Sequence, residues 1–196
     1  MLSTALLLGL MLAATVTDVL RNKIYNWSTY SGILAGLALS AVQSAWLWAD
    51  GAARPRLEYW LGGPALLVSV NGLLTCGVLM IVCFSFFPGI GGGDVKLMAM
   101  IGTFLGAKEF LGNNDARDAL LWTFVVGACF GLIVLVWRVG PVTTVFRVVR
   151  LIATRLLRLS WLQPLSDEER QALKPPVFLA PSALVAAVIV KFGLVR

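Results

Sequence analysis

Residues 86–102 read FFPGIGGGDVKLMAMIG, a stretch in which three consecutive glycines lead into Asp94 and an apolar run. Across the 196 residues, 59% are hydrophobic and only 13% are charged. Soluble globular domains carry about 25% charged residues, so this composition leaves no soluble domain of useful size. It indicates a membrane protein, and in such a protein the position of Asp94 needs an explanation.

Apolar stretches long enough to cross a bilayer, about 20 residues each, recur along the chain. Six spans are predicted, at residues 1–18, 28–49, 64–87, 94–111, 119–137 and 177–194. The alternating polarity typical of a membrane barrel is absent from the sequence. We therefore expect an all-α bundle of about six transmembrane helices that forms a single domain over residues 1–196.

The segment between the last two predicted spans, residues 138–176, is expected to be a cytoplasmic loop. Within it, residues 142–162 space arginines and aliphatic residues at helical period, so that basic and apolar side chains fall on different faces. This pattern predicts an amphipathic interfacial helix on anionic lipid, with a re-entrant or spanning segment as the alternative.

The distribution of basic residues predicts the orientation. Arginine and lysine are concentrated in residues 19–27 and 138–176, which the positive-inside rule assigns to the cytoplasm. The amino terminus is then outside. Arg21 and Lys23 follow the first span and no basic residue precedes it, so we expect a retained helix and not a cleaved signal.

Two acidic residues lie beside the apolar bodies of the predicted spans. Asp18 ends the first span and Asp94 begins the fourth, and the predicted orientation places both on the cytoplasmic side. A carboxylate at membrane depth costs about 2.5–3.5 kcal/mol on insertion scales, so each is a candidate functional residue. Taken singly, Asp94 has the alternative of a helix cap, and Asp18 that of an interfacial side chain.

A pair of carboxylates with no other polar partner suits aspartyl proteolysis. The ionised carboxylate takes a proton from an attacking water, while the protonated one donates to the peptide carbonyl. Two like charges a few ångströms apart share one proton, which gives identical side chains different roles.

Other catalytic plans lack the residues they need. The chain contains no histidine, which excludes Ser-His-Asp and Cys-His arrangements and imidazole metal sites. Its three cysteines show no CxxC spacing. No cofactor and no metal are therefore expected. The net charge of +6 follows from membrane topology, so nucleic acid is not an expected partner.

Three stretches of the sequence resemble motifs of a known family. GGGDVKLMAMIG is similar to the GxGD signature of the type IV prepilin peptidases, and TDVLRNKIYNW is similar to their first motif, with Tyr25 where a proline is usual. PPVFLAPSALVA resembles, more loosely, the proline-bearing element that opens their last helix. The matching residues are Asp18, Ile24, Asn26, Gly91, Gly93, Asp94, Val95, Lys96, Leu97, Pro176, Ala180 and Pro181.

The resemblance implies a multi-pass aspartyl endopeptidase of the bacterial inner membrane, which removes the leader of prepilin-like precursors at the cytoplasmic face. Asp18 and Asp94 would be catalytic. Lys96 would bias the ionisation of the pair or bind lipid phosphate, or it would simply be a snorkelling cation. The residues with expected supporting roles are Gly91, Gly92, Gly93, Lys96, Ile24, Asn26 and Pro181, the glycines by leaving room for a substrate backbone.

Larger members of the family carry a tetracysteine zinc element after the first span and also methylate the product. Residues 19–27 leave no room for that element, so the chain resembles the short peptidase-only branch that serves tight-adherence (Flp-type) pili. The expected partners are prepilin-like precursors and membrane lipids, and the oligomeric state stays open. The alternatives are a protease of the presenilin and signal-peptide-peptidase kind, a small cation or proton transporter using the same pair, and a non-catalytic platform component of a secretion system.

Overall fold

The computed structural model describes residues 1–21, 23–49, 60–86, 90–110, 112, 114–140, 143 and 179–194. Every element in these ranges is an α-helix, which confirms the predicted all-helical class. The helices are α1 (Leu2–Arg21), α2 (Asn26–Ala49), α4 (Leu66–Phe86), α5 (Gly92–Leu105), α6 (Asp115–Val139) and α9 (Leu179–Lys191).

The predicted count of six spans is not confirmed, although each helix falls on one of the six predicted stretches. Within the described residues, three helices are long and apolar enough to cross a membrane: Leu2–Arg21, Leu66–Phe86 and Asp115–Trp137. α2 has the length but is not among them, and α9 has only 13 residues. α5 ends at Leu105 and does not continue to residue 111.

The early end of α5 has a local cause. Gly106 takes a φ of +75°, a conformation that glycine adopts without the steric cost that a Cβ would bring. Its N–H closes the last helical turn on the carbonyl of Gly102, and the next N–H, from Ala107, donates to Val68 O at 2.8 Å. The chain therefore leaves the helix and binds the backbone of α4.

The contacts group into two compact units, which we describe separately. The first comprises Met1–Val126 and Phe178–Arg196, and the second comprises Gly127–Val177. The described part of the second unit is the later half of α6 with Gly140 and Thr143. The predicted amphipathic helix at residues 142–162 lies, apart from Thr143, outside the described residues. The single domain over residues 1–196 stays a prediction.

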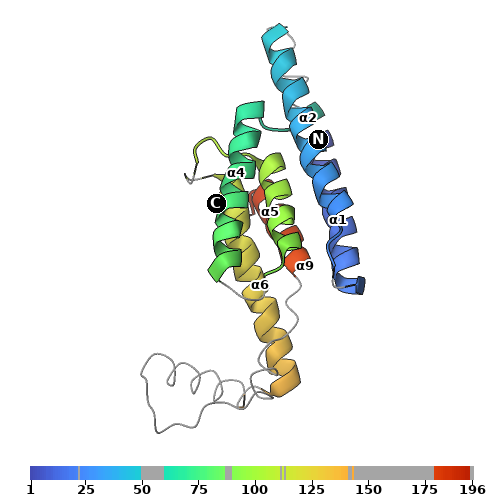
Figure 1. The fold of residues 1–196 in the computed structure, drawn as a ribbon, viewed down its shortest axis with the longest axis vertical. Helices are drawn as coiled ribbons and strands as arrows, with labels where there is room; N and C mark the ends of the chain where they lie inside the picture. The colour runs from blue at the N-terminus through green and yellow to red at the C-terminus, as the bar shows by residue number, and fades with distance from the viewer. Residues whose placement is uncertain are drawn as a thin grey trace. The chain divides into compact units, whose positions relative to one another are not determined.

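In the first unit, α5 is the central helix. It contacts α4, α2, α9 and α1, and Figure 1 shows it between α4 and the pair formed by α1 and α2. Its buried residues cover all sides of the helix: Leu97, Met98, Met100, Ile101, Gly102, Thr103, Phe104 and Leu105. The neighbouring helices therefore hold this short helix in place, together with Asp94 in its first turn.

The backbones of α4 and α5 touch at a pair of glycines. A Cβ placed on Gly102 would overlap the carbonyl oxygen of Gly72, and a Cβ on Gly72 would overlap that of Gly102. Beside them, the Ser69 hydroxyl donates to Thr103 O at 2.7 Å. Small residues at a helix crossing allow this close approach, which is how apolar helices associate in lipid.

Gly102→Val is expected to lower the free energy of unfolding by about 3 kcal/mol, because the new side chain meets backbone atoms of α4 that cannot move aside. Chemical or thermal unfolding of the purified protein in detergent measures this. Gly9→Ala is the matched control, since a Cβ there meets nothing within 4 Å. If both variants unfold like the wild type, the close packing of α4 on α5 is wrong.

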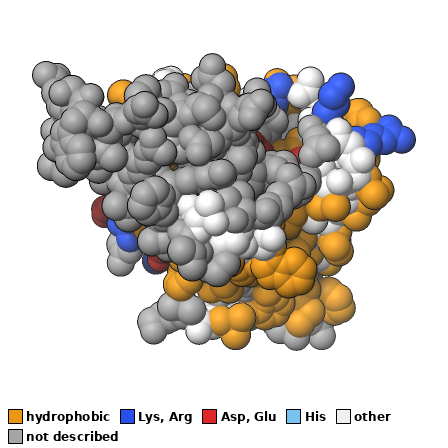
Figure 2. Space-filling view, turned by 90° about the horizontal axis from the view of Figure 1, so that it is seen from below, with side chains coloured by type: hydrophobic (Ala, Val, Ile, Leu, Met, Phe, Trp, Pro, Cys, Tyr) orange, Lys and Arg blue, Asp and Glu red, His pale blue; other side chains and the backbone are white. Residues whose placement is uncertain are grey.

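The buried face of α1 leads directly to an acidic residue. Its buried positions recur every three or four residues, as expected of a helix with one face against a core: Ser3, Leu7, Met11, Ala14 and Asp18. On the outside, large apolar side chains such as Leu12, Leu34 and Leu67 are exposed. Figure 2 shows apolar side chains gathered over the described part of one face, with Lys and Arg at its edge. Such an apolar exterior is that of a membrane protein.

Candidate active site

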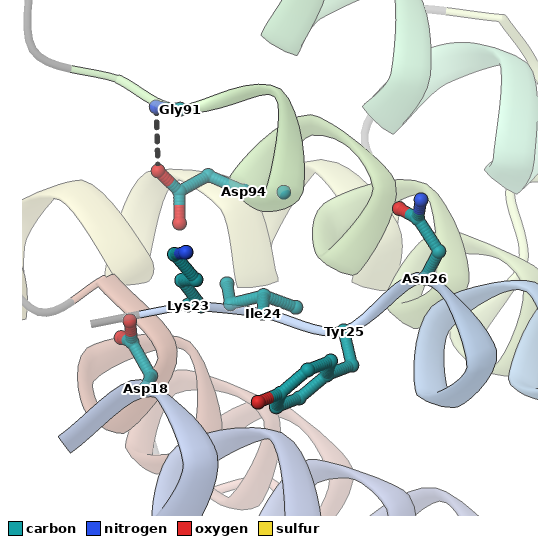
Figure 3. A pocket seen from close by; sticks show the side chains of 8 residues that line it. Asp18, Lys23, Ile24, Tyr25, Asn26, Gly91 and Asp94 are labelled. Carbon is teal, nitrogen blue, oxygen red and sulfur yellow. Dashed lines mark hydrogen bonds between the residues drawn. The ribbon is translucent and has the colours of Figure 1, made fainter. Parts of the chain in front are cut away.

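One pocket in the first unit, of about 380 Å³, collects residues from four segments of the chain. These segments are the end of α1, the connector to α2, the first residue of α2 and the start of α5. Figure 3 shows the pocket from close by. Its lining residues are Asp18, Lys23, Ile24, Tyr25, Asn26, Gly91, Gly93 and Asp94. Nine residues were predicted from the sequence to have catalytic or supporting roles. Six of them line this pocket: Asp18, Ile24, Asn26, Gly91, Gly93 and Asp94.

Asp94 is oriented by the start of its own helix. α5 begins at Gly92, and the N–H of Gly91 donates to Asp94 Oδ2 at 2.8 Å. The capping role considered from the sequence is therefore present. It uses one carboxylate oxygen, and in Figure 3 the other oxygen points toward the connector residues of the pocket. The cap consequently fixes the direction of the carboxylate and leaves it able to act.

Asp18 is held by a helix distant in sequence. The N–H of Ala180, in the first turn of α9, donates to Asp18 Oδ2 at 3.3 Å, and the Asp18 residue is only 9% exposed. Pro181 follows in the same turn, where the missing N–H of proline costs nothing. Pro181 does not line the pocket. Its position is next to the residue that binds Asp18.

The two carboxylates face one space from different helices. Asp18 comes from the end of α1 and Asp94 from the first turn of α5, and both residues line the same pocket. A water or a peptide carbonyl in that space could exchange a proton with either residue. Within the described ranges, no three acidic or sulfur side chains converge in the way a metal site requires.

The three glycines before Asp94 have three different surroundings. A Cβ on Gly93 would lie 3.0 Å from Ile24 Cβ, so glycine here lets the start of α5 approach the connector closely. Gly91 lines the pocket and donates to Asp94. A Cβ on Gly92 would meet nothing within 4 Å. Room for a substrate backbone beside these glycines stays a prediction.

In Figure 3 the connector between α1 and α2 runs beside the Asp18 carboxylate and below Asp94, and the Lys23 side chain projects from it toward Asp94. It contributes Lys23, Ile24 and Tyr25 to the pocket. The hydroxyl of Tyr25 accepts a hydrogen bond from Arg21 Nη1 at 2.8 Å. The sequence indicated Lys23 only as a topology charge. Nothing in its spacing distinguishes it from the other basic residues beside the spans, which is why its place in the pocket was missed.

Lys96 lies outside the pocket lining. Its Nζ donates to Asn26 Oδ1 at 2.8 Å and stands 4.9 Å from the centroid of the Tyr30 ring. This contact was not among the roles that the sequence suggested for Lys96. It joins the second turn of α5 to the first turn of α2.

Comparison with known proteins adds one positive finding. A family model described as the type IV leader peptidase family matches residues 5–136, which is more than half of the chain. No curated protein matches. No solved structure matches either. The matched range contains both carboxylates of the pocket, and it ends before α9.

Proposed function

Because the chain belongs to the type IV leader peptidase family, we propose that it cleaves the leader of prepilin-like precursors as an aspartyl endopeptidase, with Asp18 and Asp94 as its catalytic pair. Membership makes it a peptidase and implies prepilin-like substrates, and its apolar helices make it a membrane protein. The observation that carries the aspartyl mechanism is that two acidic residues from separate helices line one pocket.

The proposed reaction uses one water and one shared proton. One carboxylate accepts a proton from the water as its oxygen attacks the peptide carbonyl, and the other donates its proton to the carbonyl oxygen. Collapse of the tetrahedral intermediate then breaks the C–N bond: the first carboxyl gives its proton to the leaving amine, and one hydroxyl of the intermediate returns a proton to the second carboxylate as the product carbonyl forms. The pair regains its original protonation with one proton between the two residues.

The proposed location is the cytoplasmic face of the bacterial inner membrane, with the amino terminus outside. The pocket lies where α1 ends and where α2, α5 and α9 begin, so these elements share one end. Arg21 and Lys23 stand at this end, which supports its assignment to the cytoplasm by the positive-inside rule. Only residues 22–25 separate α1 from α2, too few for an inserted zinc element, so we propose peptidase activity without methylation.

The experiment that tests this function uses purified protein in lipid vesicles with prepilin-like precursors, and the product is identified by mass. A variant with Cys76, Cys83 and Cys129 replaced by serine is expected to cleave within about twofold of the wild-type rate, also with a chelator present. The reason is that two carboxylates and a water need neither thiol nor metal. The new amino terminus should carry no methyl group.

Three results would contradict the proposal. Loss of cleavage when the cysteines are replaced would indicate a cysteine mechanism in place of the aspartyl mechanism. Loss of cleavage when the chelator is added would indicate a metal mechanism. Failure of the wild type to cleave any of a panel of prepilin-like precursors would remove the substrate class.

A further inference from the structure

We propose that Lys96 is a positioning residue, which fastens the start of α5 to the start of α2 and so fixes Asp94 against the connector that carries the rest of the pocket. This inference rests on the proposed function, in which Asp94 must keep its place relative to Asp18. It assigns Lys96 an action through Asn26, and not through the carboxylates or through lipid.

The ammonium group of Lys96 is engaged on two sides by one helix. It donates to the side-chain oxygen of Asn26, the first residue of α2, at 2.8 Å, and it stands 4.9 Å from the ring centroid of Tyr30, one turn further along the same helix. A charged donor gives a stronger hydrogen bond than a neutral one, and an aromatic ring adds a cation–π attraction. The two interactions attach α5 to the first and second turns of α2.

A second contact lies on the other side of Asp94. Gly93 meets Ile24 so closely that an added Cβ would stand 3.0 Å from Ile24 Cβ. Asp94 therefore lies between two residues of α5 that contact the connector or α2: Gly93 before it and Lys96 after it. Ile24 and Asn26 in turn flank Tyr25, and all three of these connector and α2 residues line the pocket. The start of α5 is thus attached at two points to residues 24–26, and the pocket lies between these two segments.

Lys96 does not reach the carboxylates themselves. It is not a lining residue of the pocket, and within the described residues the structure contains no ion pair between Lys96 and Asp18 or Asp94. Its loss removes no ion pair with either carboxylate and is therefore expected to act through the position of Asp94. A displacement of about 1 Å at a reacting group is enough to slow a reaction roughly a hundredfold.

The test compares Lys96→Met, Asn26→Leu and the double variant in vesicles. Each single substitution is expected to lower kcat by roughly 10- to 100-fold with KM within about twofold of the wild type, because geometry and not substrate affinity is lost. The double variant should be no slower than the slower single variant. Lys96→Arg should recover most of the rate, since guanidinium can both donate to Asn26 and stack on Tyr30.

Two further readouts and one control variant separate this role from others. The pH–rate profile of Lys96→Met should keep its shape and midpoints, whereas a direct effect on the ionisation of the pair would displace them. The loss should be equal in vesicles of neutral and of anionic lipid, whereas a lipid-phosphate site would act only in the anionic ones. Lys108→Met is the matched control, because it removes an exposed lysine just beyond α5 and should keep the wild-type rate.

Amide hydrogen exchange tests the attachment without any substrate. Residues 23–26 should exchange faster in Lys96→Met and in Asn26→Leu than in the wild type or in Lys108→Met. Unchanged exchange, additive losses in the double variant, a displaced pH profile or a loss confined to anionic lipid would each overturn the positioning role. If the wild type cleaves while these results fail, only the inference is wrong. If the wild type cleaves nothing, the proposed function fails and the exchange result still decides the attachment.

Discussion

Asp94→Asn is expected to reduce kcat/KM for precursor cleavage by roughly 10³- to 10⁴-fold, the scale seen when one member of a catalytic unit is removed. Asparagine can neither take a proton from water nor supply one to a carbonyl. It keeps a side-chain oxygen that can accept the hydrogen bond from the Gly91 N–H, so the start of α5 should be preserved. The rate is measured with purified protein, and the unfolding temperature should change little.

Asp115→Asn is the matched control for Asp94→Asn. Asp115 is also an acidic residue in the first turn of a helix, α6, and it does not line the pocket. Its substitution should leave the cleavage rate within about twofold of the wild type. A rate for Asp94→Asn above a tenth of the wild-type rate would show that proton transfer at this position is not needed.

Asp18→Asn is expected to cause a loss as large as that of Asp94→Asn, because the reaction needs one ionised and one protonated carboxyl at the same time. The amide oxygen can still accept from the Ala180 N–H, so the position of α9 should be retained. The comparison with Asp18→Ala, measured by cleavage rate and by unfolding, separates the two functions of this carboxylate. Alanine should also lower stability, since it leaves the Ala180 N–H without its acceptor.

A variant that carries both Asp18→Asn and Asp94→Asn tests whether the two aspartates act together. If the residues act as one unit, the double variant should be no slower than either single variant. Multiplied losses, or a slow but pH-independent reaction in Asp18→Asn alone, would contradict a shared proton.

Much of the site followed from local sequence signals. The fourth span was predicted to begin at Asp94, directly after the glycines, and the helix begins two residues earlier, at Gly92. The role of Asp18 was predicted from its depth and from the resemblance of TDVLRNKIYNW to the first motif of the prepilin peptidases. Asp18 also continues the helical spacing of the buried face of α1, a signal that the sequence itself contains.

Contacts between distant segments could not be deduced in this way. The residues that hold Asp18 and Lys96 are 162 and 70 positions away, and hydropathy or motif spacing reports only on neighbours along the chain. The length of α5 was overestimated for a related reason. The predicted span included residues 106–111, GAKEFL, but the backbone torsion at Gly106 and the hydrogen bond from Ala107 N–H to Val68 O end the helix first.

The catalytic pair is tested by cleavage of a co-expressed prepilin-like precursor in membranes that contain equal amounts of wild type, Asp18→Asn, Asp94→Asn or Asp115→Asn. Wild type and Asp115→Asn are expected to shorten the precursor at the leader junction, and Asp18→Asn and Asp94→Asn are expected to leave it uncut. Cleavage at the wild-type rate by either Asp18→Asn or Asp94→Asn would contradict the catalytic pair.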